Sequence, residues 1–308
     1  MSVFLCVVAG AVTVYIFIYY GVFRAIRCTS SVKLKGKTVV VTGSNTGIGK
    51  STALDLAKRG ARVILACRNS ERVVFMPVDL ASFKSVRSFA ETFLKTEPRL
   101  DILINNAGEA VSRTEDGFDM AFGVNHLGHF LLTNLLLERL KQCSPSRVVT
   151  VSSLLHHLGR IDFSLLGSTK DSESGQSPWQ NFQAYCNSKL CNVLFTRELA
   201  NHLEGSGVTC FTLHPGVVYT ELCRNISWWQ QLLMIPIAKL FFLDTDGGSQ
   251  TTLHCSLQDG IESFSGRYFS NCGVQHMGVR GRDDSLAKKL WEVSERLTGF
   301  HTRVSLNR

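Results

Sequence analysis

The sequence lacks the closely spaced cysteine pairs that bind zinc or cross-link small secreted domains. None of its ten cysteines forms a C-x-x-C pair, and no internal repeat or linker divides residues 38–308. This argues against a structural zinc site and a disulfide scaffold, and reduced thiols in a cytosol-facing domain are expected. With 44% hydrophobic and 19% charged residues, the chain can fill a sizeable core. It is therefore neither disordered nor collagen-like, and one large folded domain is expected.

Acidic residues are also missing from residues 1–37, which contain five basic ones. The whole chain has 33 basic and 25 acidic residues, a net charge of +8 that by itself would suggest a nucleic-acid partner. Without the first 37 residues, 28 basic and 25 acidic residues remain, or +3 over 271 residues. That balance is ordinary for a soluble enzyme, so no nucleic-acid partner is predicted.

Residues 3–23 form an uncharged, largely apolar run of twenty-one residues. This length suits a helix that crosses a bilayer core of roughly 30 Å. The alternative, a secretory signal peptide, would need a basic residue before a shorter apolar stretch, and Met1 and Ser2 supply none. Because the basic residues follow the run, the positive-inside rule places the rest of the chain in the cytosol. We expect a single-pass anchor at residues 3–23, in the endoplasmic reticulum membrane, and a basic linker at 24–37 that contacts membrane lipid.

The rest of the chain, residues 38–300, alternates strand-like and helix-like segments. Apolar, β-branched runs predict strands at residues 38–43, 61–67, 73–78, 100–105, 147–153 and 208–214. Helices are predicted at residues 49–59, 83–94, 118–140 and 181–204, with Ser82 as the cap of the second. This alternation predicts an α/β fold with a doubly wound parallel sheet of the Rossmann type and helices on both faces.

A glycine-rich turn joins the first predicted strand to the first helix. Backbone N–H groups in such a turn, together with the positive end of the helix, can hold a phosphate. A dinucleotide site is favoured, but two alternatives stand beside it. Gly49-Lys50-Ser51 matches the end of a P-loop, although Ser44 occupies the place of its first glycine, and the turn could simply pack helix on strand. The candidate cofactor residues are Gly43, Ser44, Asn45, Thr46, Gly47, Ile48 and Gly49.

Four further motifs follow the turn in a fixed order. They are NNAG at residues 105–108, NHLG at 125–128, YCNSK at 185–189 and HPG at 214–216. Taken together, these motifs resemble the short-chain dehydrogenase/reductase family over residues 36–297. Within it, VNHLGHF, AYCNSKL and GVTCFTLHPG are similar to the retinol dehydrogenase branch. The resemblance implies an oxidoreductase that transfers a hydride between a nicotinamide cofactor and a lipophilic alcohol or carbonyl compound, similar to retinol or retinal.

Hydride transfer to a carbonyl needs a proton donor, stabilisation of negative charge and a cofactor in register. Tyr185 and Lys189 lie four residues apart on a predicted helix, so they share a face, and the ammonium is expected to lower the pKa of the phenol. The alternative is a surface helical pair. The resemblance implies Tyr185 as general acid/base and Lys189 as a ligand of the nicotinamide ribose. It also implies that Ser153, rather than Ser152, binds the substrate oxygen and that Asn125 anchors a water that relays protons to Lys189.

The cofactor preference is predicted from the end of the second strand. NAD-binding folds usually place an acidic residue about 20 residues beyond the glycine motif, but Arg68 stands there. A guanidinium can bind a 2′-phosphate, so Arg68 favours NADP(H), with Lys50 as a second candidate charge; both could instead be solvated surface residues. The resemblance implies further cofactor contacts from Asp79, to adenine, from Asn106, Ala107 and Gly108, and from Pro215, Gly216 and Thr220, around the nicotinamide.

Residues 226–243 are rich in large apolar side chains but are interrupted by Pro236 and Lys239 and are too short to span a bilayer. The resemblance implies that they cover the substrate, which would suit a lipophilic one. The alternative is an interfacial helix that rests on lipid. The histidine pairs at 126 and 129 and at 156 and 157 lack partnering carboxylates or thiols, so no metal site is predicted.

The connection between the second and third predicted strands is unusually short, because only residues 68–72 remain for it. Parallel neighbours usually need a crossover of at least about 10 to 12 residues. We therefore expect one crossover helix to be missing, one face of the sheet to be uncovered, and Arg68 and Asp79 to be poorly positioned. Two functions follow: an active membrane-anchored oxidoreductase, or a catalytically weak or inactive relative that serves as a membrane-associated binding or scaffold protein. No oligomeric state is predicted.

Overall fold

The protein is described here by a computed structural model that covers residues 10, 13, 26–68, 75–109, 113–164, 166, 177–216, 218 and 243–300. The expected anchor at residues 3–23 lies outside this set except for Gly10 and Thr13, and so do Thr220 and residues 226–242. Among the described residues, no helix is long and apolar enough to cross a membrane. The membrane anchor, the cofactor contact of Thr220 and the substrate cover at residues 226–243 therefore stay predictions.

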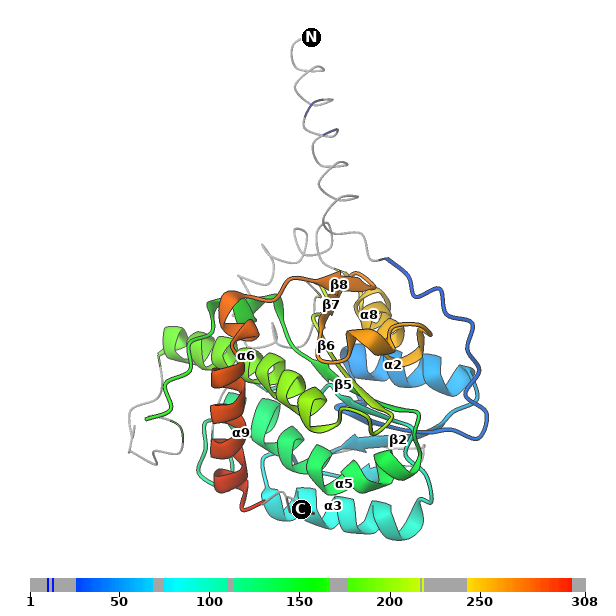
Figure 1. The fold of residues 1–308 in the computed structure, drawn as a ribbon, viewed down its shortest axis with the longest axis horizontal. Coiled ribbons are helices and arrows are strands. Elements are labelled where there is room, and N and C mark those ends of the chain that lie inside the picture. Colours follow the sequence, from blue (N-terminus) through cyan, green and yellow to red (C-terminus); the bar gives the residue numbers. More distant parts are fainter. Residues whose placement is uncertain are drawn as a thin grey trace, which may run out of the picture.

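An eight-stranded sheet lies between two layers of helices (Figure 1). The strand order is β3-β2-β1-β4-β5-β6-β7-β8, and every pair is parallel except β7 with β8. The strands are β1 Thr38–Thr42, β2 Arg62–Cys67, β3 Phe75–Pro77, β4 Ile102–Asn105, β5 Ser146–Val151, β6 Val208–Leu213, β7 Tyr268–Ser270 and β8 Gly273–Gln275. The helices are α2 Gly47–Lys58, α3 Phe83–Thr96, α4 Met120–Phe122, the π-helical turn η2 Gly123–Gly128, α5 His129–Gln142, η3 Leu154–Leu158, α6 Pro178–His202, α8 Thr245–Leu257, η5 Glu262–Phe264, η6 Val279–Arg282 and α9 Asp284–Thr298.

Alternation along the strands divides the core into two layers. Val39 and Val41 of β1 pack on the side of α2 and α8, whereas Val40 packs on the side of α3 and α5. All five residues of β1 are buried, which explains why its sequence is apolar and β-branched throughout rather than alternating. The predicted doubly wound α/β sheet is thereby confirmed.

The two best-defined sequence predictions for helices had different outcomes. Helix α3 begins as predicted, because the Ser82 hydroxyl accepts a hydrogen bond from Ser85 N at 3.4 Å. The single helix expected at residues 118–140 is instead α4, η2 and α5 in succession. The π-helical turn lies where the backbone approaches its neighbours closely: a Cβ on Gly128 would lie 2.6 Å from Leu80 O. π-Helical turns of this kind are frequent at functional sites.

The third strand forms despite the short connection. Residues 68–74 join β2 to β3, and 69–74 lie outside the described residues. In the parallel register, Leu65 is level with Phe75 and Cys67 with Pro77. Because β3 has only three residues, the chain must return just two residues along β2, about 7 Å at about 3.3 Å per residue. The structure thus pairs β2 and β3 in parallel across a connection shorter than the usual dozen residues.

On the α2 side of β2, Val63 and Cys67 are buried and Leu65 is half-buried. Leu54 of α2 is 52% exposed, while Ile64 on the opposite face is fully buried. The uncovered face and the missing helix both stay predictions, because residues 69–74 are not described.

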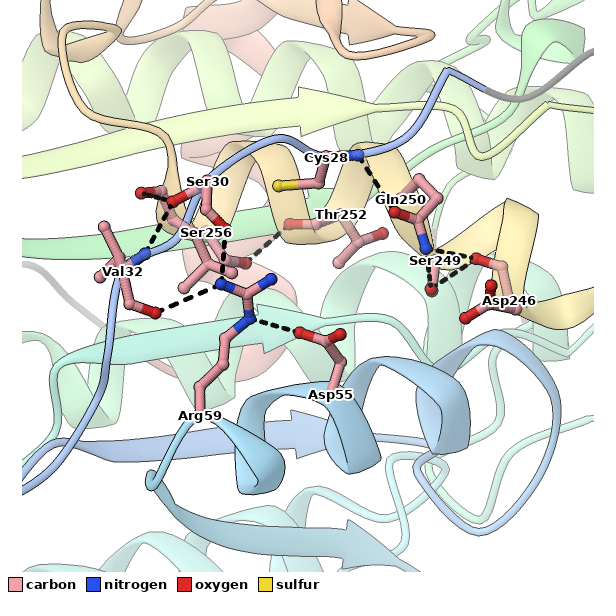
Figure 2. A network of polar contacts seen from close by, with 11 residues as sticks. Cys28, Ser30, Val32, Asp55, Arg59, Asp246, Ser249, Gln250, Thr252 and Ser256 are labelled. Atoms are coloured by element: carbon pink, nitrogen blue, oxygen red, sulfur yellow. Dashed lines mark hydrogen bonds and ion pairs between the residues drawn. The ribbon is translucent and has the colours of Figure 1, made fainter.

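Residues 26–34 cross the α2 and α8 side of the domain as an extended strap (Figure 2). Arg59, near the end of α2, donates from Nη1 to Ser30 O at 2.6 Å and to Val32 O at 3.2 Å, and from Nε to Asp55 Oδ1 at 2.5 Å. On α8, Gln250 Oε1 accepts from Cys28 N at 3.1 Å. The segment that leads away from the expected anchor is therefore bound to two helices of the domain.

Candidate active site

The predicted site residues come together at the carboxyl edge of the sheet. Because these strands are parallel, the loops that follow them meet at one edge, where doubly wound folds bind their ligands. Tyr185 and Lys189 reach this edge from α6, which packs against β5 and β6. The glycine turn follows β1, Arg68 follows β2, Asp79 follows β3, Asn106 follows β4, Ser153 follows β5, and Pro215 and Gly216 follow β6.

The glycine turn has the geometry of a phosphate site. Gly43 and Gly47 have φ values of +63° and +56°, which only glycine adopts at little cost. A Cβ on Gly49 would lie 2.3 Å from Gly43 O and 2.5 Å from Asn106 Nδ2, so the backbone there has no room for a side chain. The turn leads directly into α2, and the side chain of its N-cap Thr46 makes no capping hydrogen bond. The first N–H groups of the helix are thus available to an anion.

Two side chains, Thr42 at the end of β1 and His129 at the start of α5, hold the turn after β4 in place beside the glycine turn. Thr42 Oγ1 accepts from Asn106 N at 2.8 Å and from Ala107 N at 3.0 Å. It also contacts His129 Nε2 at 2.8 Å, while His129 Nδ1 lies 3.1 Å from Asn125 O. Since a carbonyl can only accept, Nδ1 carries the proton and Thr42 donates to Nε2. Burial lowers the pKa of His129 to about 4, which keeps the ring in the neutral form that this network requires.

Asn125 lies in η2, fully buried, and its amide group is committed to protein contacts. Its Oδ1 accepts from Glu109 N at 2.8 Å, and its Nδ2 donates to Glu109 O and to Ser188 Oγ, both at 3.0 Å. The side chain therefore fixes the loop after β4. A relay water of the kind the resemblance implies would have to bind the carbonyl oxygen of Asn125 instead.

Ser153, Tyr185 and Lys189 form the centre of the site. The Ser153 hydroxyl is hydrogen-bonded to the phenol of Tyr185, and Lys189 Nζ lies 5.5 Å from the centre of the Tyr185 ring. Burial raises the pKa of Tyr185, and the Ser153 hydrogen bond offsets this only in part. The expected lowering of the phenol pKa by Lys189 is therefore wrong for this state, because desolvation outweighs any effect of the ammonium.

Lys189 is itself strongly affected by its surroundings. Its side chain is buried, its Nζ donates to Val151 O at 3.3 Å, and burial lowers its pKa from 10.5 to about 8. Gly108 lies beside it, since a Cβ there would be 3.6 Å from Lys189 Nζ and 3.6 Å from Asn125 Oδ1. The ammonium thus borders both the tyrosine and the loop after β4, and a surface helical pair is excluded for Tyr185 and Lys189.

The structure separates the roles of two adjacent serines. Ser152 is buried, and its hydroxyl donates to Lys189 O at 2.7 Å, so it supports the backbone of α6. Ser153 is half-buried and faces Tyr185. This arrangement agrees with the assignment of Ser153, rather than Ser152, to the substrate oxygen.

His156 was not predicted as a site residue, yet it holds Ser153 in place. Its Nδ1 donates to Ser153 O at 2.8 Å, and its Nε2 accepts from Gly278 N at 3.2 Å. Burial lowers its pKa to about 4, so the neutral ring can donate and accept at once. Sequence reasoning considered His156 only as a metal ligand. Within the described part of the chain, no group of three or more His, Cys, Asp or Glu side chains could hold a metal ion.

Arg68 and Asp79 form the outer part of the site, on either side of the short β2 to β3 connection. Asp79 Oδ1 accepts from Ala81 N at 3.0 Å, and Asp79 N donates to Ser85 Oγ at 2.9 Å. Arg68 forms an ion pair with Glu109. Arg68 and Asp79 both lie at the carboxyl edge of the sheet, after β2 and β3, and the expectation that they are poorly positioned for a cofactor stays a prediction. At the other end, Gly216 has a φ of +87° and its Cα faces Leu243.

The family model of short chain dehydrogenases matches residues 37–171 and 171–231 of the sequence. The chain belongs to the short-chain dehydrogenase/reductase family. Dehydrogenase/reductase SDR family member 13 from Homo sapiens is 50% identical over 305 residues, which cover 93% of this chain and 79% of that protein. Retinol dehydrogenase 11 from Homo sapiens is 49% identical over 297 residues, 89% of each chain. The predicted resemblance to this family and to its retinol dehydrogenase branch is thus confirmed.

Solved structures agree with this membership. A structure from Mycobacterium Paratuberculosis is 36% identical with a TM-score of 0.68, and the match covers 87% of this chain and 95% of that one. A protein of Beutenbergia cavernae, described as an NAD(P)-dependent gluconate 5-dehydrogenase with bound NADP, has a TM-score of 0.58 at 23% identity. At that identity the second match shows the fold alone.

The residues present fit the dinucleotide cofactor that the family implies. Ser44 Oγ is buried and has no hydrogen-bond partner among the described residues, so a ligand at the glycine turn would satisfy it. The close approach of Gly49 to Gly43 and Asn106 leaves a backbone-lined cradle. Family membership supports the dinucleotide interpretation of the turn and gives no support to the P-loop alternative.

Proposed function

We propose that the protein is a membrane-anchored oxidoreductase that transfers a hydride between NADP(H) and a lipophilic, retinol- or retinal-like alcohol or carbonyl compound. The observation that carries this proposal is the cluster of Ser153, Tyr185 and Lys189 beside the glycine turn at the carboxyl edge of the sheet. The names of the relatives, which include retinol dehydrogenases 11 and 12, support a lipophilic substrate.

When bound, the dinucleotide supplies or accepts the hydride; the chain supplies the proton and the geometry. The Ser153 hydroxyl is placed to donate to the substrate oxygen, and Tyr185 to exchange a proton with it. Because burial raises its pKa, the phenol is protonated at neutral pH, which suits donation to a carbonyl oxygen that becomes an alcohol. The Lys189 ammonium stabilises negative charge as the phenolic proton leaves.

The cofactor contacts follow from the same edge. The backbone of residues 43–49 and the start of α2 would hold the pyrophosphate, and Lys189 the nicotinamide ribose. Arg68 supports NADP(H), because it follows β2 where NAD-binding folds usually have an acidic residue, and a guanidinium can bind a ribose 2′-phosphate. Asp79, residues 106–108 and residues 215–216 line the remaining positions of this edge.

The membrane part of the proposal rests on sequence. Residues 3–23 would form the anchor, with residues 24–37 on the cytosolic side of the endoplasmic reticulum membrane. Residues 226–243 would cover the substrate. The docking of residues 26–34 on α2 and α8 supports a fixed, short distance between the domain and the bilayer.

A second candidate function is favoured by the short β2 to β3 connection. A chain that binds cofactor weakly would act as a membrane-associated binding or scaffold protein. The two are separated by expressing the full chain in membranes and assaying retinoids, steroids and aldehydes with NADPH, for the wild type and Tyr185→Phe. We expect turnover of a lipophilic substrate that falls about 10³-fold in the variant, with an unchanged Kd for NADPH. No NADPH binding at millimolar concentration would refute the enzyme and leave the scaffold.

A further inference from the structure

An ion pair joins the ends of two strands above the glycine turn. Arg68 follows β2, Glu109 lies four residues after the end of β4, and their side chains meet through Nη2 and Oε1. Neither is buried, since the side chains are 59% and 42% exposed. The pair lies forty-one residues apart in sequence, so no local pattern could have revealed it.

The sheet order places this ion pair over the dinucleotide site. Strand β1 lies between β2 and β4, so a contact from the end of β2 to the end of β4 must cross the end of β1. The span is two strand spacings, about 10 Å. The glycine turn begins at Gly43, directly after β1. The Arg68 guanidinium therefore meets a carboxylate at the place where it would otherwise meet a ribose 2′-phosphate.

The carboxylate is presented from a fixed backbone. Glu109 N donates to Asn125 Oδ1 at 2.8 Å, and Glu109 O accepts from Asn125 Nδ2 at 3.0 Å. Asn125 is fully buried in the π-helical turn η2. Both main-chain polar groups of Glu109 are thus bound by one rigid amide, and the side chain starts from a defined point beside the cofactor site.

A carboxylate at this point changes the charge that a cofactor meets. Arg68 alone would offer one positive charge to a 2′-phosphate, which carries nearly two negative charges at neutral pH. Paired with Glu109, Arg68 contributes no net charge, and the incoming phosphate must displace or adjoin a like charge. NAD(H) carries a hydroxyl there, which has no charge to repel and can donate to a carboxylate, as it does to the acidic residue of NAD-binding folds.

We propose that Glu109 is a specificity-determining residue that competes with the cofactor 2′-phosphate for Arg68, so that the protein accepts NAD(H) alongside NADP(H). The inference rests on the proposed function, since it needs a bound dinucleotide. It assigns to Glu109 the part that the acidic residue after the second strand usually has, supplied here from the loop after β4.

The test compares binding of two reduced cofactors that differ only in the 2′-phosphate. Kd values for NADPH and NADH are measured by fluorescence titration of the full chain in detergent, for the wild type, Glu109→Gln and Glu115→Gln. Glu115 is an exposed carboxylate on the following segment that does not meet Arg68, so its variant removes the same charge as a matched control. Thermal protection by 2′,5′-ADP and by 5′-AMP gives a second readout that needs no nicotinamide.

We expect Glu109→Gln to tighten NADPH about fivefold, the effect of one screened charge at about 4 Å in water, and to change NADH less than twofold. Protection by 2′,5′-ADP should rise and that by 5′-AMP should not. When Arg68→Gln is combined with Glu109→Gln, the double variant should no longer bind NADPH more tightly than the wild type. The inference is overturned if the ratio of the NADPH Kd to the NADH Kd in Glu109→Gln stays within twofold of the wild-type ratio. It is also overturned if Glu115→Gln shifts this ratio equally. Neither result would affect the proposed function. Failure of both cofactors to bind the wild type would overturn the proposed function together with the inference.

Discussion

Replacing Lys189 by methionine should make the protein more stable while it removes activity. The lysine is buried, and burial lowers its pKa from 10.5 to about 8. Each pKa unit corresponds to about 1.4 kcal/mol, so below pH 8 the charged side chain costs the folded state about 3 kcal/mol. Methionine has a similar length and no charge. The carbonyl of Val151 would keep a partner, because Asn192 Nδ2 also donates to it at 3.1 Å.

The pH dependence of this gain follows from linkage. Between pH 8 and pH 10.5 the unfolded lysine is protonated while the folded one is not, so the stability of the wild type rises with pH over this window. Above it, neither state is charged and the cost has gone. We therefore expect Lys189→Met to exceed the wild type by about 3 kcal/mol at pH 7 and the two proteins to converge near pH 10.5.

The assay is denaturant unfolding of the full chain in detergent at several pH values, with Lys95→Met as the control. Lys95 is 71% exposed, so its variant should differ little from the wild type at any pH. A Lys189→Met protein that is no more stable than the wild type at pH 7, or a difference that does not depend on pH, would refute the reasoning that Lys189 carries a desolvation cost.

Two further predictions concern the strap and the serine pair. Arg59→Met should lower the free energy of unfolding by about 2 kcal/mol and expose residues 26–34 to limited proteolysis, because Arg59 donates to two carbonyls of the strap. The control is Lys58→Met, since Lys58 is exposed in the same turn of α2. Equal cleavage of both variants would contradict the role assigned to Arg59. Ser153→Ala should lower kcat about a hundredfold at nearly unchanged stability, and Ser152→Ala should lose about 1 kcal/mol of stability with a smaller loss of kcat. Urea unfolding and steady-state kinetics on both variants would show the opposite pattern if the serines had the reverse roles.

Much of the first two-thirds of the fold was predictable because its signals are local. Strands β1, β2, β4, β5 and β6 are apolar runs that are long enough to recognise, and α3 has both a cap at Ser82 and an apolar stripe. The third strand was expected at residues 73–78 and forms at Phe75–Pro77. Its pairing across a short connection depends on register, which the sequence does not display.

The C-terminal third was not predicted, for physical reasons that differ between elements. Helix α8 is buried on nearly all sides, and many of its own buried residues are small and polar, such as Ser249, Thr251 and Thr252. It therefore has no apolar stripe that the sequence could reveal. Strands β7 and β8 have three residues each, too few for a periodic pattern. Helix α9 does have an apolar stripe, with Leu290 and Trp291 buried, and this stripe is visible in the sequence.

The ordered motifs predicted that the glycine turn, Ser153, Tyr185 and Lys189 belong to one site, and the structure has these residues at the same edge of the sheet. What they missed is the support between distant segments: Thr42 with His129, His156 with Gly278, and Arg68 with Glu109. These contacts join residues that are from 41 to 122 positions apart, and only the sheet order brings them together. The pKa of Tyr185 was predicted with the wrong sign because burial is a property of the fold, and the sequence showed only the neighbouring lysine.

The central claim, that this chain binds a nicotinamide dinucleotide and transfers its hydride with Tyr185 as proton donor, is tested most directly by isotope transfer. The full chain is incubated in membranes with NADPH deuterated at C4 of the nicotinamide, on either face, and with retinal. The account predicts deuterium at the carbinol carbon of the retinol formed, from one face only, and none above background with Tyr185→Phe. Equal deuterium incorporation by the wild type and Tyr185→Phe, or none with either under conditions in which NADPH binds, would contradict it.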